Sequence, residues 1–242
     1  MATRTVSYGK CFLCGAKVAK NAASRHLAKC LPAHDSPGGK TAHLFHLRVE
    51  GAYAPGYWMH IEIPASATLN DLDSFLRSIW LECCGHLSAF TIHGVVYERN
   101  TGMVDAMWKD IFGPGGRVSS MRKKLFDVLR PGDVFSHEYD YGTTTELTLK
   151  VVGEREGPVP KDKVRLLVRN YAPDIRCIEC DQRAEWLYVH DYPFKPYCAV
   201  HAETMDDAVL LPVVNSPRVG DCGYDGPADE ALWFEETVPA AA

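Results

Sequence analysis

No apolar run in the sequence approaches the roughly 20 residues that a membrane-spanning helix needs. The stretch MATRTVSYGK at the start contains no apolar segment of the kind that secretory signals carry, so we expect a cytoplasmic protein with no membrane partner. The sequence also has no Walker loop, Rossmann glycine run, nucleophile elbow or HExxH motif. The commonest motifs for nucleotide binding, serine hydrolysis and zinc proteolysis are therefore excluded, and we assign no catalytic residue.

Cysteine, by contrast, is abundant, with nine in 242 residues. In a reducing compartment, closely spaced cysteines bind metal more often than they form disulfides. Charge is unevenly distributed, because residues 1–40 carry seven basic residues and one acidic residue, a net charge of +6. The whole chain has a net charge of −5, so the remainder has −11. A basic start and an acidic remainder indicate separate roles, since basic surfaces attract phosphates and acidic surfaces repel them.

The first metal-binding pattern lies in residues 9–30, where a Cys-x2-Cys pair is followed eleven residues later by a His-x3-Cys pair. The four candidate ligands are Cys11, Cys14, His26 and Cys30. A turn at Gly15 and a shared helix face for the second pair would bring them together, as in a C2HC-type zinc finger. Four protein ligands leave no open position, so the zinc would be structural. The alternative is a small basic helix with unliganded thiols.

A second metal-binding pattern occupies residues 177–201, where two short pairs are separated by seventeen residues. Its candidate ligands are Cys177, Cys180, Cys198 and His201. Two tight knuckles can meet across a hairpin of this length, which predicts a second structural zinc ion. His190 and Cys222 are reserve ligands in case His201 points away. The alternative is two reduced cysteine pairs on adjacent loops.

Between the two patterns, residues 68–84 have the strongest helical periodicity in the chain. Thr68 and Asp71 predict a capping box at its start, and Gly85 is placed to end it. Alternating or continuous apolar residues predict strands on either side; their ranges are 42–50, 57–64, 86–99, 134–142, 143–154 and 164–171. Residues 118–129 favour a second helix, and residues 101–117 a short helix or ordered loop. Residues 154–163 are typical of a linker.

Two motifs in this central region, Gly85–Phe90 (GHLSAF) and Tyr139–Gly142 (YDYG), resemble those of the plasmid pRiA4b ORF-3-like family. That family also occurs in IS1096-type transposable elements, and the resemblance covers about residues 41–153. It implies an α+β domain without an established activity. The sequence departs from the family after the second motif, where Thr143, Thr145 and Leu147 replace the frequent Asp-x-Trp-x-His. Chemistry that depends on that Asp and His is therefore not carried over.

Together these features predict an α+β fold in which a mixed or antiparallel sheet packs on one long helix, flanked by two small zinc modules. The expected domains are a zinc finger at 1–35, the α+β core at 41–153, and a zinc-knuckle module with an acidic tail at 164–242.

Two further sets of residues have both a chemical and a structural interpretation. A third metal or acid–base site could be built from the histidines of the sheet region and the cysteines at the helix end, His43, His46, His60, His86, His93, Cys83 and Cys84. Partly buried histidines with ordinary hydrogen bonds are the favoured explanation. The carboxylates Glu138, Asp140 and Glu146 could act as general acid and base, but hairpin charges are more often only solvated.

The leading functional hypothesis is a zinc-binding, non-catalytic binding or adaptor protein in a mobile-element context. Its basic finger is expected to contact nucleic acid or a protein partner, with the phosphate contacts made by Lys17, Lys20, Arg25 and Lys29. The alternative is an enzyme whose pocket lies between the core sheet and the Tyr139–Gly142 hairpin. The sequence defines neither a substrate nor an oligomeric state.

Overall fold

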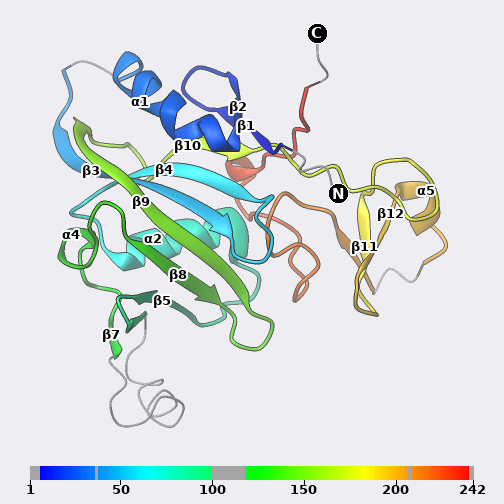
Figure 1. The fold of residues 1–242 in the computed structure, drawn as a ribbon. Helices are drawn as coiled ribbons and strands as arrows, with labels where there is room; N and C mark the ends of the chain where they lie inside the picture. The colour runs from blue at the N-terminus through cyan, green and yellow to red at the C-terminus, as the bar shows by residue number, and fades with distance from the viewer. Residues whose placement is uncertain (1–5, 36–37, 100–117, 206–208, 240–242) are drawn as a thin grey trace. The chain divides into compact units, whose positions relative to one another are not determined.

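The computed structural model describes residues 6–35, 38–99, 118–205 and 209–239. Within these ranges most strands belong to one sheet, with the order β2-β1-β10-β4-β3-β9-β8-β5-β6-β7 (Figure 1). Neighbouring strands are antiparallel except β6 and β7, which are parallel. The strands of this sheet are β1 (Tyr8–Cys11), β2 (Lys17–Ala19), β3 (Thr41–Gly51), β4 (Trp58–Pro64), β5 (Ser88–Ile92), β6 (Val95–Glu98), β7 (Val118–Ser120), β8 (Val134–Tyr139), β9 (Thr145–Pro158) and β10 (Arg165–Asn170).

A second, three-stranded sheet has the order β12-β11-β13. Its strands are β11 (Trp186–Tyr188), β12 (Lys195–Tyr197) and β13 (Leu210–Pro212). Helices are short; they are η1 (Lys20–Ala22), α1 (Ala23–Ala33), α2 (Leu69–Leu76), the π-helical turn η2 (Arg77–Leu81), α4 (Leu125–Val128), α5 (Ala199–Ala202) and η4 (Glu230–Leu232). None of the described helices is long and apolar enough to cross a membrane.

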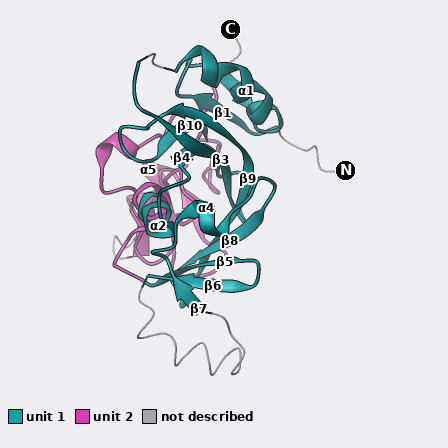
Figure 2. Cartoon of the chain, turned by 90° about the vertical axis from the view of Figure 1, so that its left-hand side faces the viewer, with its two compact units in different colours: residues 1–75, 87–170 teal, residues 76–86, 171–242 magenta. Residues whose placement is uncertain are grey.

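The chain divides into two compact units (Figure 2). Unit 1 contains residues 1–75 and 87–170, and unit 2 contains residues 76–86 and 171–242. The large sheet lies in unit 1 and the small sheet in unit 2. The expected finger, residues 1–35, therefore shares a unit with the expected core, while the segment after α2 joins the C-terminal part of the chain.

Strand β4 lies near the middle of the large sheet, and all seven of its residues are buried. A strand buried on both faces needs cover on both sides. On one face, Trp58 packs with Leu27 of α1 and with residues of β10. On the other side of the sheet, helix α2 contacts the strands through Asp73, whose carboxylate accepts hydrogen bonds from Ser88 of β5 and His137 of β8.

Helix α2 begins as the sequence predicts. The Thr68 backbone N–H donates to Asp71 Oδ2 at 2.9 Å, and the Asp71 backbone N–H donates to Thr68 Oγ1 at 3.2 Å, which is a reciprocal capping box. The predicted single long helix over 68–84 is not observed. The α-helix ends at Leu76 and continues as a π-helical turn to Leu81, after which Glu82 is extended.

The coarse fold class, a mixed α/β protein with a large and mostly antiparallel sheet, is confirmed. Two local predictions are wrong. Residues 118–129 contain β7 and the four-residue helix α4 rather than one long helix. The expected linker over 154–163 is strand as far as Pro158, because β9 pairs with β3 up to Thr41. The prediction for residues 101–117 falls outside the described residues.

Candidate metal centres

The first predicted ligand set, the N-terminal cluster, lies in unit 1 and consists of Cys11, Cys14, His26 and Cys30. Its four ligand atoms all lie within 4.8 Å of one another. Cys11 Sγ lies 3.8 Å from Cys30 Sγ, and Cys14 Sγ lies 3.5 Å from His26 Nε2. Two thiolates bound tetrahedrally to one zinc ion at about 2.3 Å each are about 3.8 Å apart, so these distances suit zinc.

Local structure explains why these four side chains converge. The turn after Cys11 is closed by a bond from the Cys11 N–H to the Ala16 carbonyl at 2.9 Å, and Gly15 takes φ +75°. Helix α1 presents His26 and Cys30 on one face, one turn apart. The cysteines at either end of the set, Cys11 and Cys30, are buried in an apolar cluster with Leu27 and Trp58.

The second predicted set, the C-terminal cluster, lies in unit 2 and consists of Cys177, Cys180, Cys198 and His201. His201 Nδ1 lies 3.4 Å from Cys177 Sγ and 3.3 Å from Cys198 Sγ, and Cys180 Sγ lies 3.8 Å from Cys198 Sγ. The β11–β12 hairpin returns the chain to Cys198, and α5 then turns His201 inward. His201 is the fourth donor of this cluster, so His190, which was expected as a reserve ligand, does not take part. His190 instead lies beside the ring of Tyr188.

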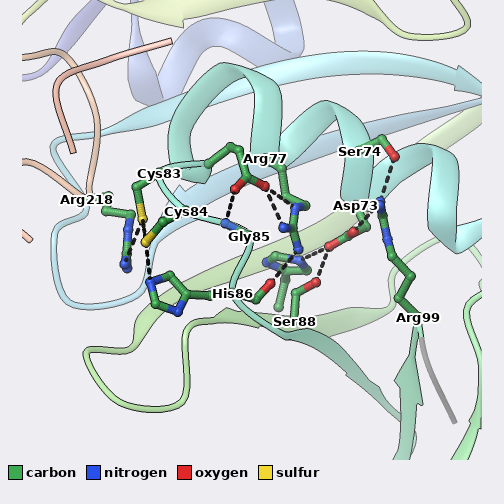
Figure 3. Close-up of polar contacts among 12 residues, drawn as sticks. Asp73, Ser74, Arg77, Cys83, Cys84, Gly85, His86, Ser88, Arg99 and Arg218 are labelled. Atoms are coloured by element: carbon green, nitrogen blue, oxygen red, sulfur yellow. Dashed lines mark hydrogen bonds and ion pairs between the residues drawn. The ribbon is translucent and has the colours of Figure 1, made fainter. Parts of the chain in front are cut away.

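A third group of donors, the tail cluster, also lies in unit 2 and consists of Cys83, Cys84, His86 and Cys222. Cys84 Sγ lies 2.9 Å from His86 Nε2 and 3.7 Å from Cys222 Sγ, and Cys83 Sγ lies 3.5 Å from Cys84 Sγ. Figure 3 shows the Cys83, Cys84 and His86 side chains converging beside Arg218. Cys222, expected as a reserve ligand for the C-terminal cluster, belongs here instead.

Crowded thiols cannot all ionise without a cation. Burial, followed by hydrogen bonds with Cys14 and Cys11, raises the pKa of Cys30 to about 12. Hydrogen bonds with Cys83 and Cys222 raise the pKa of Cys84 to about 12. Burial also acts to raise the pKa of Cys177, but backbone hydrogen bonds outweigh it and lower that pKa to about 6. A divalent metal would supply the charge that lets three thiolates share one site.

The expected histidine site of the sheet region does not form around one centre. His43 Nε2 lies 3.1 Å from Glu154, and His93 Nε2 lies 3.0 Å from Asp133. His46 Nε2 and His60 Nδ1 hydrogen-bond each other at 2.8 Å, which the sequence reasoning missed because the pairing of β3 with β4 was not known. Three members of that set, His86, Cys83 and Cys84, do come together in the tail cluster, while its other four histidines lie outside every cysteine cluster in the described part of the chain.

The four basic residues proposed for phosphate contact differ in their surroundings. Lys20 Nζ is held by the Pro55 carbonyl at 2.7 Å and by Glu50 at 2.6 Å, so it has a structural role. Lys17 is exposed, with its ammonium 4.8 Å from the centre of the Tyr8 ring. Arg25 and Lys29 are exposed on α1, one helical turn apart. Three of the four are therefore exposed at the surface.

The hairpin carboxylates of the enzyme hypothesis have local partners. Asp140 is buried at φ +66°, and its Oδ1 accepts from the Gly142 N–H at 3.0 Å. Glu138 lies opposite Glu146 across β8 and β9. Burial, followed by repulsion from Glu146, raises the pKa of Glu138. Asp140 thus shapes the turn, and the enzyme hypothesis remains a prediction.

A buried polar network that the sequence did not reveal surrounds Asp73 in unit 1 (Figure 3). Its Oδ1 accepts from Ser88 Oγ at 2.7 Å and from His137 Nε2 at 2.8 Å, and its Oδ2 lies 2.7 Å from Arg99. Burial acts to raise the pKa of Asp73, but the bond from His137 and the charge of Arg99 lower it overall. The ionised carboxylate anchors α2 to the sheet.

No family model and no curated protein matches the chain. Among solved structures, a protein of unknown function from Methanosarcina mazei Go1 is similar, with 18% identity and a TM-score of 0.41. The similarity covers 52% of this chain and 67% of that chain. Such a likeness identifies neither a family nor an activity, so the pRiA4b ORF-3-like resemblance remains a prediction.

Proposed function

We propose that the chain is a zinc-binding, non-catalytic binding protein in which the N-terminal and C-terminal clusters each hold one structural zinc ion. The observation that carries this proposal is the donor set. Each cluster offers three thiols and one imidazole at distances that fit a single tetrahedral ion. Zinc that is fully coordinated by protein has no open position for a substrate or an activated water, so its contribution is to stability.

The choice of zinc follows from the ligand chemistry. Soft thiolates with one imidazole select zinc over hard cations such as magnesium and calcium, which prefer oxygen ligands. None of the nine cysteines, all of which lie in the described residues, forms a disulfide in the structure. Metal binding to such small modules is coupled to their folding, so removal of the ion should unfold the module that holds it.

A histidine substitution pair tests the C-terminal site. We expect His201→Asn to lower the zinc content of the purified full-length chain by one ion and to lower the midpoint of thermal unfolding. His190→Asn is the matched control, because His190 lies in the same unit but outside the cluster. Equal zinc contents for His201→Asn and the unsubstituted chain would refute the assignment.

Nucleic acid is the partner that the basic surface favours, on the strength of three exposed cations in a region of net charge +6. We expect Arg25→Glu combined with Lys29→Glu to weaken binding of a DNA duplex or an RNA strand, and binding by the unsubstituted chain to fall steeply with salt. Lys161→Glu combined with Lys195→Glu is the charge-matched control, since both lysines are exposed away from α1 in the sequence. Absence of binding at low salt would remove nucleic acid from the proposal and leave a protein partner.

A further inference from the structure

The tail cluster has the same composition as the two predicted sites. Each of the three clusters contains three cysteines and one histidine, so the nine cysteines of the sequence are divided equally among them. The tail cluster joins Cys84 and Cys222 across 138 positions in the sequence. A chance meeting of unrelated surface thiols would not be expected to reproduce the donor set of the other two.

The backbone on both sides of the tail cluster is shaped to present the ligands. Gly85, between Cys84 and His86, has φ +78°, and its N–H donates to Glu82 Oε1 at 2.6 Å. Arg77 in turn bonds Glu82 Oε2 at 2.7 Å through Nε and the His86 carbonyl at 2.8 Å through Nη1 (Figure 3). This arrangement folds residues 82–86 into a tight loop with three donor side chains.

The backbone around Cys222, on the tail side of the cluster, is constrained as well. Cys222 itself has φ +47°, a left-handed conformation that is uncommon for a residue with a side chain. It is followed by Gly223 at φ +69°, and the turn is closed by the Tyr224 N–H, which donates to the Asp221 carbonyl at 2.9 Å. Surrounding structure must hold Cys222 in this conformation, and a bond from its sulfur to a metal would do so.

A buried cation next to the cluster supplies an independent observation. The Arg218 side chain is fully buried, and its Nη2 lies 3.5 Å from Cys83 Sγ. A zinc ion with three thiolates and one imidazole carries a net charge of −1, so Arg218 beside a metal-bound Cys83 would balance the centre. Next to three protonated, uncharged thiols, the Arg218 guanidinium would make a weaker interaction than next to metal-bound thiolates.

We propose that Cys83, Cys84, His86 and Cys222 bind a third zinc ion, with Arg218 as its counter-charge. The ion would cross-link the loop after η2 to the acidic tail, thereby closing a large loop in the chain and fixing the tail within unit 2. This site stands independently of the two predicted from the sequence, because each of its ligands is separate from theirs.

The test compares zinc contents of the full-length chain with one ligand replaced from each side of the site, using Cys222→Ser and His86→Asn. We expect each variant to hold one zinc ion fewer than the unsubstituted chain while it retains the circular dichroism of the large sheet. His93→Asn is the control, since His93 lies outside every cluster in the described residues. An unchanged zinc content in both variants, or a Cys84–Cys222 disulfide found by mass spectrometry of the freshly purified chain, would overturn the proposal.

Arg218 provides a second test, which does not remove a ligand. Arg218→Met should weaken zinc at this one site about 10- to 100-fold, as losses around a metal's ligands generally do. In a chelator titration, one zinc ion per chain should then leave earlier, and Arg218→Lys should restore part of the affinity. Arg176→Met is the control, because Arg176 is in the same unit but pairs with Asp174 at the surface. A titration identical to that of the unsubstituted chain would show that Arg218 has no such role.

Discussion

Several buried or partly buried polar side chains in unit 1 meet a complementary group. Arg155 illustrates this arrangement, because it bonds Glu62 at 2.6 Å and Asp35 on the other side. The guanidinium of Arg155 lowers the pKa of Asp35 against the opposing effect of burial. The Asp73 network and the His46–His60 pair follow the same rule with different groups.

The His46–His60 pair should make stability depend on pH. Burial, with repulsion from Arg155, lowers the pKa of His46 to about 4, and burial also lowers that of His60. Because both pKa values lie below the unfolded value of 6.5, protons bind the unfolded chain preferentially, and stability falls as pH drops from about 6.5 towards 4. The limiting slope is about 1.4 kcal/mol per pH unit for each histidine.

Urea unfolding at pH 7 and pH 5 measures this effect. The unsubstituted chain should lose about 4 kcal/mol more stability between these values than the variant His46→Gln, His60→Gln, about 2 kcal/mol for each histidine, because glutamine does not titrate. Acid also weakens metal binding, but that loss is common to both proteins and cancels in the difference. His43→Gln is the control, since His43 is exposed and lies outside the buried pair. Equal losses in the double variant and the unsubstituted chain would contradict the role of the buried pair.

The Asp73 carboxylate should contribute more to the stability of the fold than an ordinary surface charge does. Asp73→Asn keeps the shape of the side chain but leaves buried His137 and the Arg99 guanidinium without their anion. We expect a loss of about 3 kcal/mol in the free energy of unfolding, as when one partner of a buried ion pair is removed. Asp127→Asn, at an exposed position on α4, should change stability by less than about 0.5 kcal/mol. Similar effects for the two variants would mean that the network contributes little.

At the scale of elements, the finger is built into the large sheet. Strand β1 pairs with β10, in the register that places Gly9 opposite Asn170, and the Phe12 N–H donates to the Leu167 carbonyl at 2.9 Å. The C2HC spacing predicted that these four side chains come together but did not predict the partner strand. Pairing between residues 8–11 and 168–170 depends on the whole topology, which no local pattern in the sequence encodes.

Gly9 allows a test of this strand pairing. A Cβ at this position would lie 2.5 Å from the Arg169 carbonyl oxygen and 2.9 Å from the Trp58 ring, and a backbone oxygen cannot easily move. Gly9→Ala should therefore separate β1 from β10 and cost about 3 kcal/mol. Gly56→Ala, where a Cβ meets nothing within 4 Å, is the control, and chemical denaturation compares the two. A Gly9→Ala chain as stable as the control would show that β1 is not paired as described.

The same contrast between local and distant information explains which elements were predictable. The capping box at Thr68 and strands such as β4 and β10 follow from spacing and alternation within a few residues. The π-helical turn after Leu76 and the extension of β9 to Pro158 depend on tertiary packing and on pairing with β3. Cys222 could not be assigned because its partners lie more than 130 positions earlier. A count of the cysteines outside the two predicted sets, which gives Cys83, Cys84 and Cys222, was the available signal.

At the scale of the whole molecule, three clusters of the same composition that could hold metal lie in the two units. With zinc bound, the N-terminal cluster would cross-link the edge of the large sheet in unit 1, and the C-terminal and tail clusters would stabilise unit 2, whose sheet in the described residues has three strands. Unit 2 has a small regular core, so metal should supply much of its stability. Exposed Lys17, Arg25 and Lys29 then mark the one surface for which we propose a partner.

The most direct test is the zinc content of the purified full-length chain, measured together with its unfolding before and after treatment with a strong chelator. Three zinc ions per chain, and loss of cooperative unfolding of unit 2 once they are removed, are the expected results. Two ions per chain would retain the sites predicted from the sequence and remove the tail site. Fewer than two ions, with unfolding that the chelator does not change, would contradict the proposal that zinc holds this protein together.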